Sequence, residues 1–136
     1  DFSYRFSSFT TDEFILLASF ELEYEKPEII SEKRKVASSG RKTNQPLRFR
    51  SAGSVFKNPK GHAAGFLIDK AGLKGKRIGD AEISTHHANF FINHGNASAS
   101  DITELIRIAK SAVLEEFNIE LELEIKTIGF GKDKVE

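Results

Sequence analysis

Residues 101–125 have the sequence DITELIRIAKSAVLEEFNIELELEI, in which two hydrophobic periods follow one another. Apolar residues first recur at helical spacing. This predicts an amphipathic helix with a capping-box-like start at Asp101 and Glu104 and an end at Asn118. From Ile119 to Ile125 apolar residues alternate with charged ones, which predicts a strand with one buried face. The stretch therefore indicates an α+β fold.

The chain before this stretch carries short apolar runs separated by glycines. Residues Ala63–Ala71 place apolar side chains at helical spacing and predict a short helix. Residues Ile78–Ser84 and Asn89–Asn93 predict two strands joined by a tight connection. Together with residues 101–125, these elements predict a small mixed sheet with packed helices.

The first 45 residues follow a different pattern. An apolar run at Phe14–Ala18 passes into alternation of apolar and glutamate residues up to Glu25, which predicts one strand. Pro27 suits a first helical turn, and a polar helix is expected from Glu28 to about Ser38, ending at Gly40. We therefore expect four regions: an N-terminal part closing with that strand (1–27), a connecting helix and linker (28–45), a C-terminal domain (46–129) and a charged tail (130–136).

The composition excludes several classes of protein. Hydrophobic residues make up 39% of the 136 residues, so a core can be buried and disorder is not expected. Twenty basic residues balance twenty acidic ones, which argues against a protein that coats nucleic acid or an anionic membrane. No apolar run approaches the roughly 18 residues of a membrane helix. The chain has no Cys and no Met and starts at Asp1, so we interpret it as a piece of something longer.

Other generic sites are poorly supported. The basic residues from Lys33 to Lys42 lack interleaved aromatic residues, and we interpret them as a solvated helix face. No metal site is expected, because no Cys and no HExxH spacing supports the histidines, which are His62, His86, His87 and His94. No dinucleotide-binding or Walker glycine pattern occurs. The turn Ser51–Pro59 fits either an anion-binding loop or a capped surface turn, and composition alone favours the second.

Seven motifs in fixed order make the sequence specific. They are Tyr4–Ser7, Gly53–Pro59, Ala64–Gly75, Gly79–Ala81, His86–Phe90, Ile92–Asn93 and Leu121–Gly129. In this order they closely resemble the C-terminal part of the UDP-N-acetylenolpyruvoylglucosamine reductase (MurB) family, and the resemblance covers essentially the whole chain. It implies a cytoplasmic flavoenzyme of peptidoglycan synthesis, in which NADPH reduces FAD and the flavin reduces an enolpyruvyl ether on a UDP-sugar to UDP-N-acetylmuramate.

The resemblance also implies roles for individual residues. Ser54 falls on the proton donor, while Arg5 and Glu124 fall on the two residues that flank the developing enolate. From the residues alone, Arg5 fits a strand cap and Glu124 a solvated face equally well. Asn58, Lys74 and Lys42 match positions that hold the diphosphate or sugar of the substrate, and His87 matches one next to the nucleotide.

This chain departs from the family pattern in two respects. The short connection Pro59–Ala63 groups the chain with members that lack a long inserted loop, whose tyrosine closes over the substrate. The FAD-binding N-terminal region of the family is absent, so the cofactor-binding residues are expected mostly outside this chain. Alone, the chain is expected to hold no flavin tightly and to be inactive. The alternatives are a non-catalytic UDP-sugar-binding module of the same fold and a structural or interaction domain.

Overall fold

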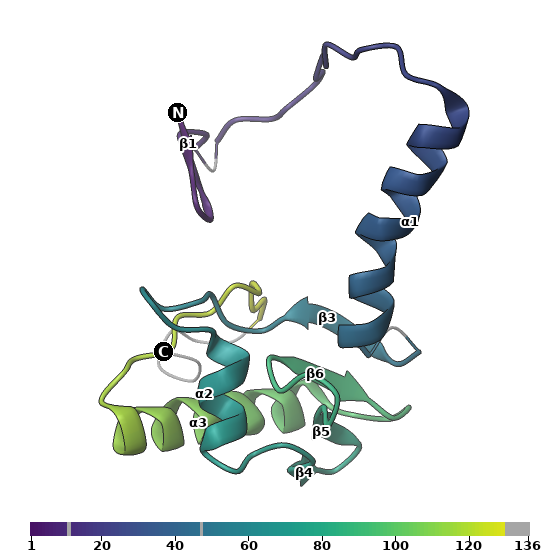
Figure 1. Ribbon diagram of the computed structural model, residues 1–136. Coiled ribbons are helices and arrows are strands. Elements are labelled where there is room, and N and C mark those ends of the chain that lie inside the picture. The colour runs from purple at the N-terminus through teal and green to yellow at the C-terminus, as the bar shows by residue number, and fades with distance from the viewer. Residues whose placement is uncertain (11, 47, 130–136) are drawn as a thin grey trace. The chain divides into compact units, whose positions relative to one another are not determined.

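The computed structural model describes residues 1–10, 12–46 and 48–129 (Figure 1). The chain divides into two compact units, Asp1–Ser38 and Ser39–Glu136. The first unit begins with a small antiparallel hairpin of β1 (Phe2–Ser3) and β2 (Phe6–Ser7), with Arg5 in its turn at a φ of 56°. It ends in helix α1 (Pro27–Asn44), which crosses the division between the units.

The strand expected between Phe14 and Glu25 is wrong for this structure, since these residues have no regular secondary structure. Their apolar side chains are almost fully exposed, with Leu16 at 93% and Leu22 at 84%. A strand needs a neighbouring strand to accept its hydrogen bonds, and no described segment pairs with this stretch. The alternation in the sequence therefore favours a strand, but without a described partner strand this segment has no regular secondary structure.

The polar helix predicted from Glu28 is confirmed, but its predicted end at Gly40 is wrong. Helix α1 continues through Gly40 to Asn44. A Cβ built at Gly40 meets no atom within 4 Å, and Gly40 is not among the glycines with positive φ. A glycine inside a helix costs only about 1 kcal/mol relative to alanine, which the residues on both sides offset.

The second unit is built on an antiparallel sheet with the strand order β3-β6-β5-β4. Its strands are β3 (Arg50–Ser54), β4 (Arg77–Ile78), β5 (Ala81–Ile83) and β6 (Phe90–Asn93). The α+β class is confirmed, and each strand pair that the structure describes is antiparallel rather than mixed. The strand predicted over 78–84 is interrupted by a turn at Gly79, whose φ is 54°.

Two helices cover the sheet and enclose the core. Helix α2 (Ala64–Lys70) packs against helix α3 (Ala99–Phe117), and α3 also packs against β4 and β5 (Figure 1). The predicted short helix at residues 63–71 is therefore confirmed. The core joins both helices, the sheet and the segment after β3, and its larger side chains are Val55, Phe56, Leu67, Ile68, Ile83, Phe91, Leu105, Ile106, Val113 and Leu121.

The start of α3 lies earlier than predicted. Ser98 is the N-cap residue, and its hydroxyl accepts a hydrogen bond from the Asp101 amide at 3.1 Å. The Asp101 carboxylate in turn accepts from the Ser98 amide at 2.8 Å, which completes a capping box. The serine-to-aspartate box was missed because Asp101 and Glu104 offered the same spacing three residues later. The predicted end at Asn118 is confirmed, since Asn118 adopts the left-handed conformation at a φ of 54°.

The strand expected at residues 119–125 is reduced to a single bridge between Leu123 and Phe56. The alternation nevertheless sets burial, because Leu121 is 2% exposed and Glu122 points to solvent. Among the described residues, no helix is both long and apolar enough to cross a membrane.

Removing the α3 cap should weaken the second unit. We expect Ser98→Ala to lower the free energy of unfolding by about 1 kcal/mol, because the Asp101 amide loses its acceptor. Ser100→Ala is the matched control, since Ser100 is an exposed residue in the first turn. Urea unfolding followed by circular dichroism measures both, and equal midpoints for the two variants would contradict the assigned cap.

Candidate functional site

Ser54 ends β3 just after an irregularity in the pairing of β3 with β6. The register shifts between Ser51 and Ser54, and Gly53 within this bulge has a φ of 86°, which L-residues rarely adopt. An extra residue in one strand bends that strand and redirects the side chains that follow it. The glycine turn of the sequence therefore acts as a bulge that sets the direction of the Ser54 side chain.

The residues after Ser54 are hydrogen-bonded along both edges. On one edge, the Val55 amide donates to the Asn89 carbonyl at 2.8 Å. On the other edge, the Glu124 amide donates to the Val55 carbonyl and the Lys57 amide to the Glu122 carbonyl, both at 2.8 Å. The backbone of Glu124 thus lies directly beside Val55, the residue that follows Ser54, although 69 positions separate Glu124 from Val55 in sequence.

A pocket of about 360 Å³ opens beside Ser54 and joins residues from four parts of the chain. Four of the residues predicted from the sequence line it, namely Ser54, Asn58, Lys74 and His87. The other lining residues are Ala63, Gly65, Phe66, Asp69, His86, Ala88 and Asn89. The volume lies within the range of small-molecule sites.

Two polar side chains fix the helix side of this pocket. The Asn58 amide oxygen accepts a hydrogen bond from the Ala64 amide at 3.0 Å, which ties the turn after Ser54 to the start of α2. The Lys74 ammonium lies 2.7 Å from the Asp69 carboxylate, and its side chain is one-third exposed. A lysine at a pocket wall supplies a point charge suited to phosphate, and Asp69 holds that charge in place.

The His87 ring closes another wall. Its Nδ1 accepts a hydrogen bond from the Asn89 amide at 3.2 Å, so the neutral ring carries its proton on Nε2. The ring also packs edge-on against Phe90, with 5.0 Å between centroids. Burial lowers the pKa of the His87 imidazole below its ordinary value, and the positive charge of Lys74 adds to the lowering. The wall is therefore an uncharged hydrogen-bond donor at neutral pH.

The three remaining predicted residues are described separately from this pocket. Arg5 belongs to the first unit, where its guanidinium lies 5.4 Å from the Tyr4 ring centroid. Lys42 lies in α1, and its side chain is outside the described part of the structure. Glu124 is held beside Val55 by its backbone and is half-buried, but it is not a lining residue of the pocket.

Among the lining residues that sequence reasoning missed, two shape the pocket through specific contacts. Asn89 is 3% exposed and contacts the Ser54 side of the site through its backbone and its side chain. Gly65 faces His87, since a Cβ built on it would lie 2.9 Å from His87 Cε1. A polar residue placed at the start of an apolar strand was the available signal for Asn89. Gly65 gave no signal, because its neighbour comes from 22 positions away.

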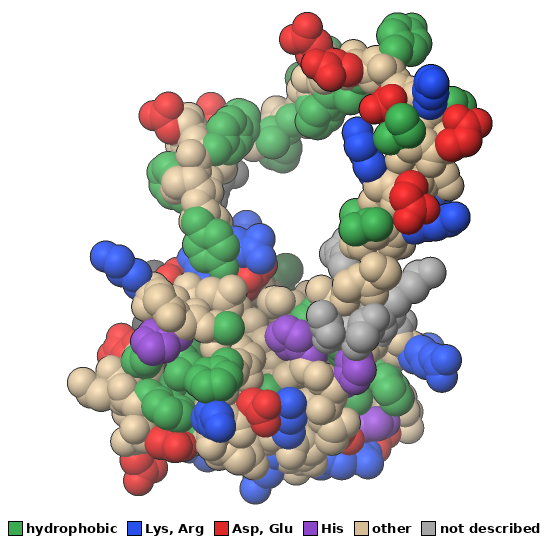
Figure 2. Space-filling view, viewed as in Figure 1, with side chains coloured by type: hydrophobic (Ala, Val, Ile, Leu, Met, Phe, Trp, Pro, Cys, Tyr) green, Lys and Arg blue, Asp and Glu red, His purple; other side chains and the backbone are tan. Residues whose placement is uncertain are grey.

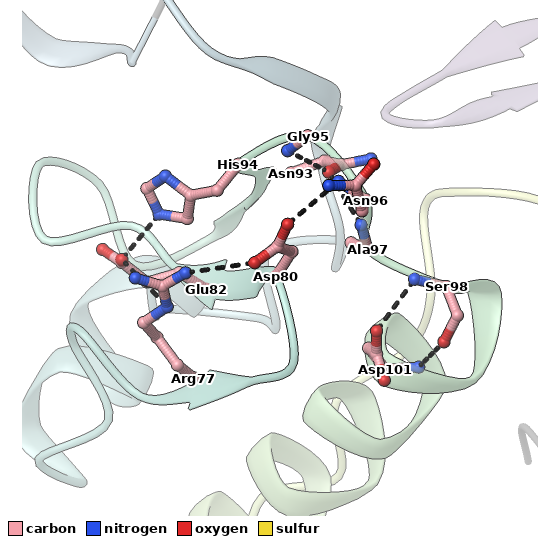
Figure 3. A network of polar contacts seen from close by, with 10 residues as sticks. All are labelled: Arg77, Asp80, Glu82, Asn93, His94, Gly95, Asn96, Ala97, Ser98 and Asp101. Carbon is pink, nitrogen blue, oxygen red and sulfur yellow. Dashed lines mark hydrogen bonds and ion pairs between the residues drawn. The ribbon is translucent and has the colours of Figure 1, made fainter.

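A second polar cluster lies at the other end of β6 (Figure 3). The Asn93 amide oxygen accepts from the Gly95 amide at 2.7 Å and the Ala97 amide at 3.0 Å, so it orders the turn that leads to α3. Nearby, His94 Nε2 lies 2.8 Å from a Glu82 carboxylate oxygen. No group of three metal-binding side chains occurs among the described residues.

Charges of both signs lie side by side on one face of the second unit (Figure 2). On the face shown in Figure 2, positive and negative side chains of the second unit are interspersed, in keeping with twenty residues of each sign. Recognition of a charged ligand therefore depends on single residues such as Lys74 rather than on a charged face.

The lowered pKa of His87 should make stability fall with acidification. As the pH drops below the ordinary pKa, near 6.5, the unfolded chain binds this proton more readily than the folded chain. The free energy of unfolding therefore falls as the pH drops below about 6.5. We expect the chain to lose more stability than His87→Gln between about pH 7.5 and about pH 5.5 in urea unfolding. An equal loss in both proteins would show that the His87 ring does not carry this effect.

A methyl group at Gly65 should displace His87. Gly65→Ala adds a Cβ 2.9 Å from His87 Cε1, whereas Gly40→Ala adds one with nothing within 4 Å. We expect the control Gly40→Ala to stabilise its helix by about 1 kcal/mol and Gly65→Ala to gain less. The His87 ring signals in NMR spectra should move in Gly65→Ala alone, and unmoved signals would contradict the packing.

Comparison with known proteins points to one family. The family model of the UDP-N-acetylenolpyruvoylglucosamine reductase C-terminal domain matches residues 45–128. Reductases of that name from Listeria welshimeri and Moorella thermoacetica are 46% and 43% identical, over 93% and 96% of this chain. The chain spans 43% of the length of either relative.

A solved structure agrees in fold. The crystal structure of UDP-N-acetylenolpyruvylglucosamine reductase (MurB) from Thermus caldophilus is similar over 79% of this chain and 38% of that chain, with a TM-score of 0.65 and 46% identity. The match of the family model over more than half of the residues agrees with the order of motifs along the chain. The chain therefore belongs to the UDP-N-acetylenolpyruvoylglucosamine reductase family and contains its C-terminal domain.

Proposed function

We propose that this chain is the substrate-binding part of an FAD-dependent reductase that converts UDP-N-acetylenolpyruvoylglucosamine to UDP-N-acetylmuramate with NADPH, in cytoplasmic peptidoglycan precursor synthesis. One observation carries the proposal. Ser54, Asn58, Lys74 and His87 are matched to the family one by one, and they line a single pocket. The names of the relatives support the same reaction.

Within this proposal, residues 46–129 bind the substrate and residues 28–45 connect that domain to the FAD-binding region. Residues 1–27 are the tail of the FAD-binding region, and residues 130–136 are a charged extension. The exposed apolar side chains of Phe14, Leu16 and Leu17 support this division, because adjacent apolar side chains left in water favour contact with another part of a protein.

FAD does not fit the described residues of this chain. No buried side-chain nitrogen or oxygen among them lacks a hydrogen-bond partner, so none of these atoms is left for a cofactor to satisfy. The sequence also has no dinucleotide-binding glycine loop. We therefore assign FAD to the part of the family that this chain does not span, and we assign binding and proton transfer to the chain itself.

The pocket suits a nucleotide diphosphate linked to a sugar. Lys74 supplies a positive charge for phosphate, and Asn58 orders the adjoining turn. Lys42 adds a second positive charge in this proposal. The neutral His87 ring donates its Nε2 proton to an acceptor on the nucleotide. Because the pKa of the ring is lowered, His87 carries no positive charge at neutral pH, and the phosphate is bound by lysine.

The chemistry is assigned to Ser54, Arg5 and Glu124. Ser54 donates a proton to the carbon next to the substrate carboxylate, and the bulge at Gly53 aims its hydroxyl. Arg5 stabilises the negative charge that develops on the carboxylate side. Glu124, anchored through its amide beside Val55, donates a hydrogen bond when it is protonated.

A non-catalytic UDP-sugar-binding module is the second candidate. One observation favours it: every residue that lines the pocket belongs to the second unit, and binding requires no more than such a pocket. A binding module needs no proton donor, so a test of proton donation by Ser54 separates the two candidates.

Ser54→Ala should slow one half-reaction, the reoxidation of flavin by substrate. The test uses a chimera in which this chain replaces the matching residues of the Listeria welshimeri reductase. In the Ser54→Ala chimera, reduction of bound flavin by NADPH should proceed normally. Reoxidation by the enolpyruvyl substrate should slow by about 10²–10⁴-fold, because the general acid is lost. Stopped-flow absorbance of the flavin measures both steps.

Ser100→Ala is the matched control, because Ser100 is an exposed residue of α3 and does not line the pocket. Its two half-reactions should both match those of the parent chimera. Normal reoxidation in Ser54→Ala would remove the proton-donor role. A parent chimera that binds the substrate without ever reoxidising flavin would favour the binding module.

A further inference from the structure

Asn89 is one of two buried polar side chains among the described residues, the other being Ser84. The Asn89 amide group forms hydrogen bonds with both backbone groups of Phe56. Its Oδ1 accepts from the Phe56 amide at 2.9 Å, and its Nδ2 donates to the Phe56 carbonyl at 2.8 Å. Burial of an amide is unfavourable unless such bonds form, so this residue type is specified by its partner.

The backbone of Asn89 extends the same set of contacts to the two sides of the pocket. Its carbonyl accepts from the Val55 amide at 2.8 Å, next to Ser54. Its amide donates to His87 Nδ1 at 3.2 Å, which orients the ring on the opposite wall. One residue thus ties the segment that carries Ser54 to the ring of His87.

This arrangement replaces a missing stretch of sheet. The pairing of β3 with β6 ends at Ser54 and Phe90, so Phe56 has no strand partner on that edge. Phe56 is completely buried, and its backbone groups cannot turn to water instead. Only a side chain with a donor and an acceptor at amide spacing satisfies both groups, which excludes apolar and carboxylate residues of similar size.

We propose that Asn89 is a positioning residue of this site, which holds residues 54–58 in place so that the Ser54 hydroxyl and Asn58 face the pocket together. The proposal rests on the proposed function for its catalytic consequence. Asn89 touches neither the reacting atoms nor the proton that moves. It acts through the backbone of Val55 and Phe56.

The test replaces Asn89 with alanine in the Listeria chimera. Flavin reduction by NADPH should stay unchanged, while reoxidation by the enolpyruvyl substrate should slow by about 10–100-fold, because a small misplacement of a reacting group costs that much. Asn93→Ala is the matched control. Asn93 also bonds two backbone groups through its side chain on β6, but it lies outside the pocket. Its reoxidation rate should stay within about 2-fold of the parent.

NMR spectra of the 136-residue chain give a second readout that needs no activity. Asn89→Ala should move the amide signals of residues 54–58, and Asn93→Ala should move those of residues 93–97 instead. If Asn89→Ala does not fold, Asn89→Ser is measured in both assays, since its single hydroxyl cannot bridge both groups of Phe56.

Unmoved signals at residues 54–58, or equal slowing of both half-reactions, would overturn the proposal. A parent chimera that never reoxidises its flavin would count against the proposed function instead. The NMR comparison would then still decide whether Asn89 holds the segment.

Discussion

The segment Val55–Lys57 is hydrogen-bonded on one edge to Asn89 and on the other to residues 122–124, and the second unit is organised around it. Phe56 enters the core from this segment with no exposed surface. Ser54 precedes it and Asn58 follows it, so the same constraint that completes the core also places two polar residues at the pocket. Packing and site geometry therefore share their hydrogen bonds.

The charges of the pocket are local and nearly balanced. Lys74 is paired with Asp69, and burial lowers the pKa of the His87 imidazole below its ordinary value. A phosphate entering this pocket would compete with Asp69 for one ammonium group. The affinity then depends on how far Asp69 can move away, since an exposed ion pair contributes little by itself.

Sequence patterns predicted the helices best, because a helix satisfies its own backbone and its period depends on nearby residues. The apolar spacing at residues 102–117 and the end at Asn118 are examples. Strand predictions failed where the partner was distant or missing. Residues 14–25 have the apolar pattern of a strand but pair with no described strand. Residues 119–125 alternate between apolar and charged side chains and form only one bridge.

For the site, family motifs brought Ser54, Asn58, Lys74 and His87 to one pocket, although no local rule connects them. Local sequence patterns could not predict Asn89 or Gly65. The Asn89 side chain bonds Phe56, and Gly65 leaves room for His87, and each of these partners lies more than 20 positions away in sequence. Arg5 remains a prediction, as its unit is described separately.

The contacts around Phe56 also constrain the order of folding. Its partners lie 33 residues away at Asn89 and 67 residues away at Leu123, so the chain must close two long loops before both edges are satisfied. Loop closure of this kind is entropically unfavourable and late contacts of high sequence separation slow folding. Helix α3 can form from local contacts alone, whereas the two edges of this segment depend on distant residues. A nascent chain can therefore complete both edges only after residue 123 has left the ribosome, although every residue that lines the pocket lies between positions 54 and 89.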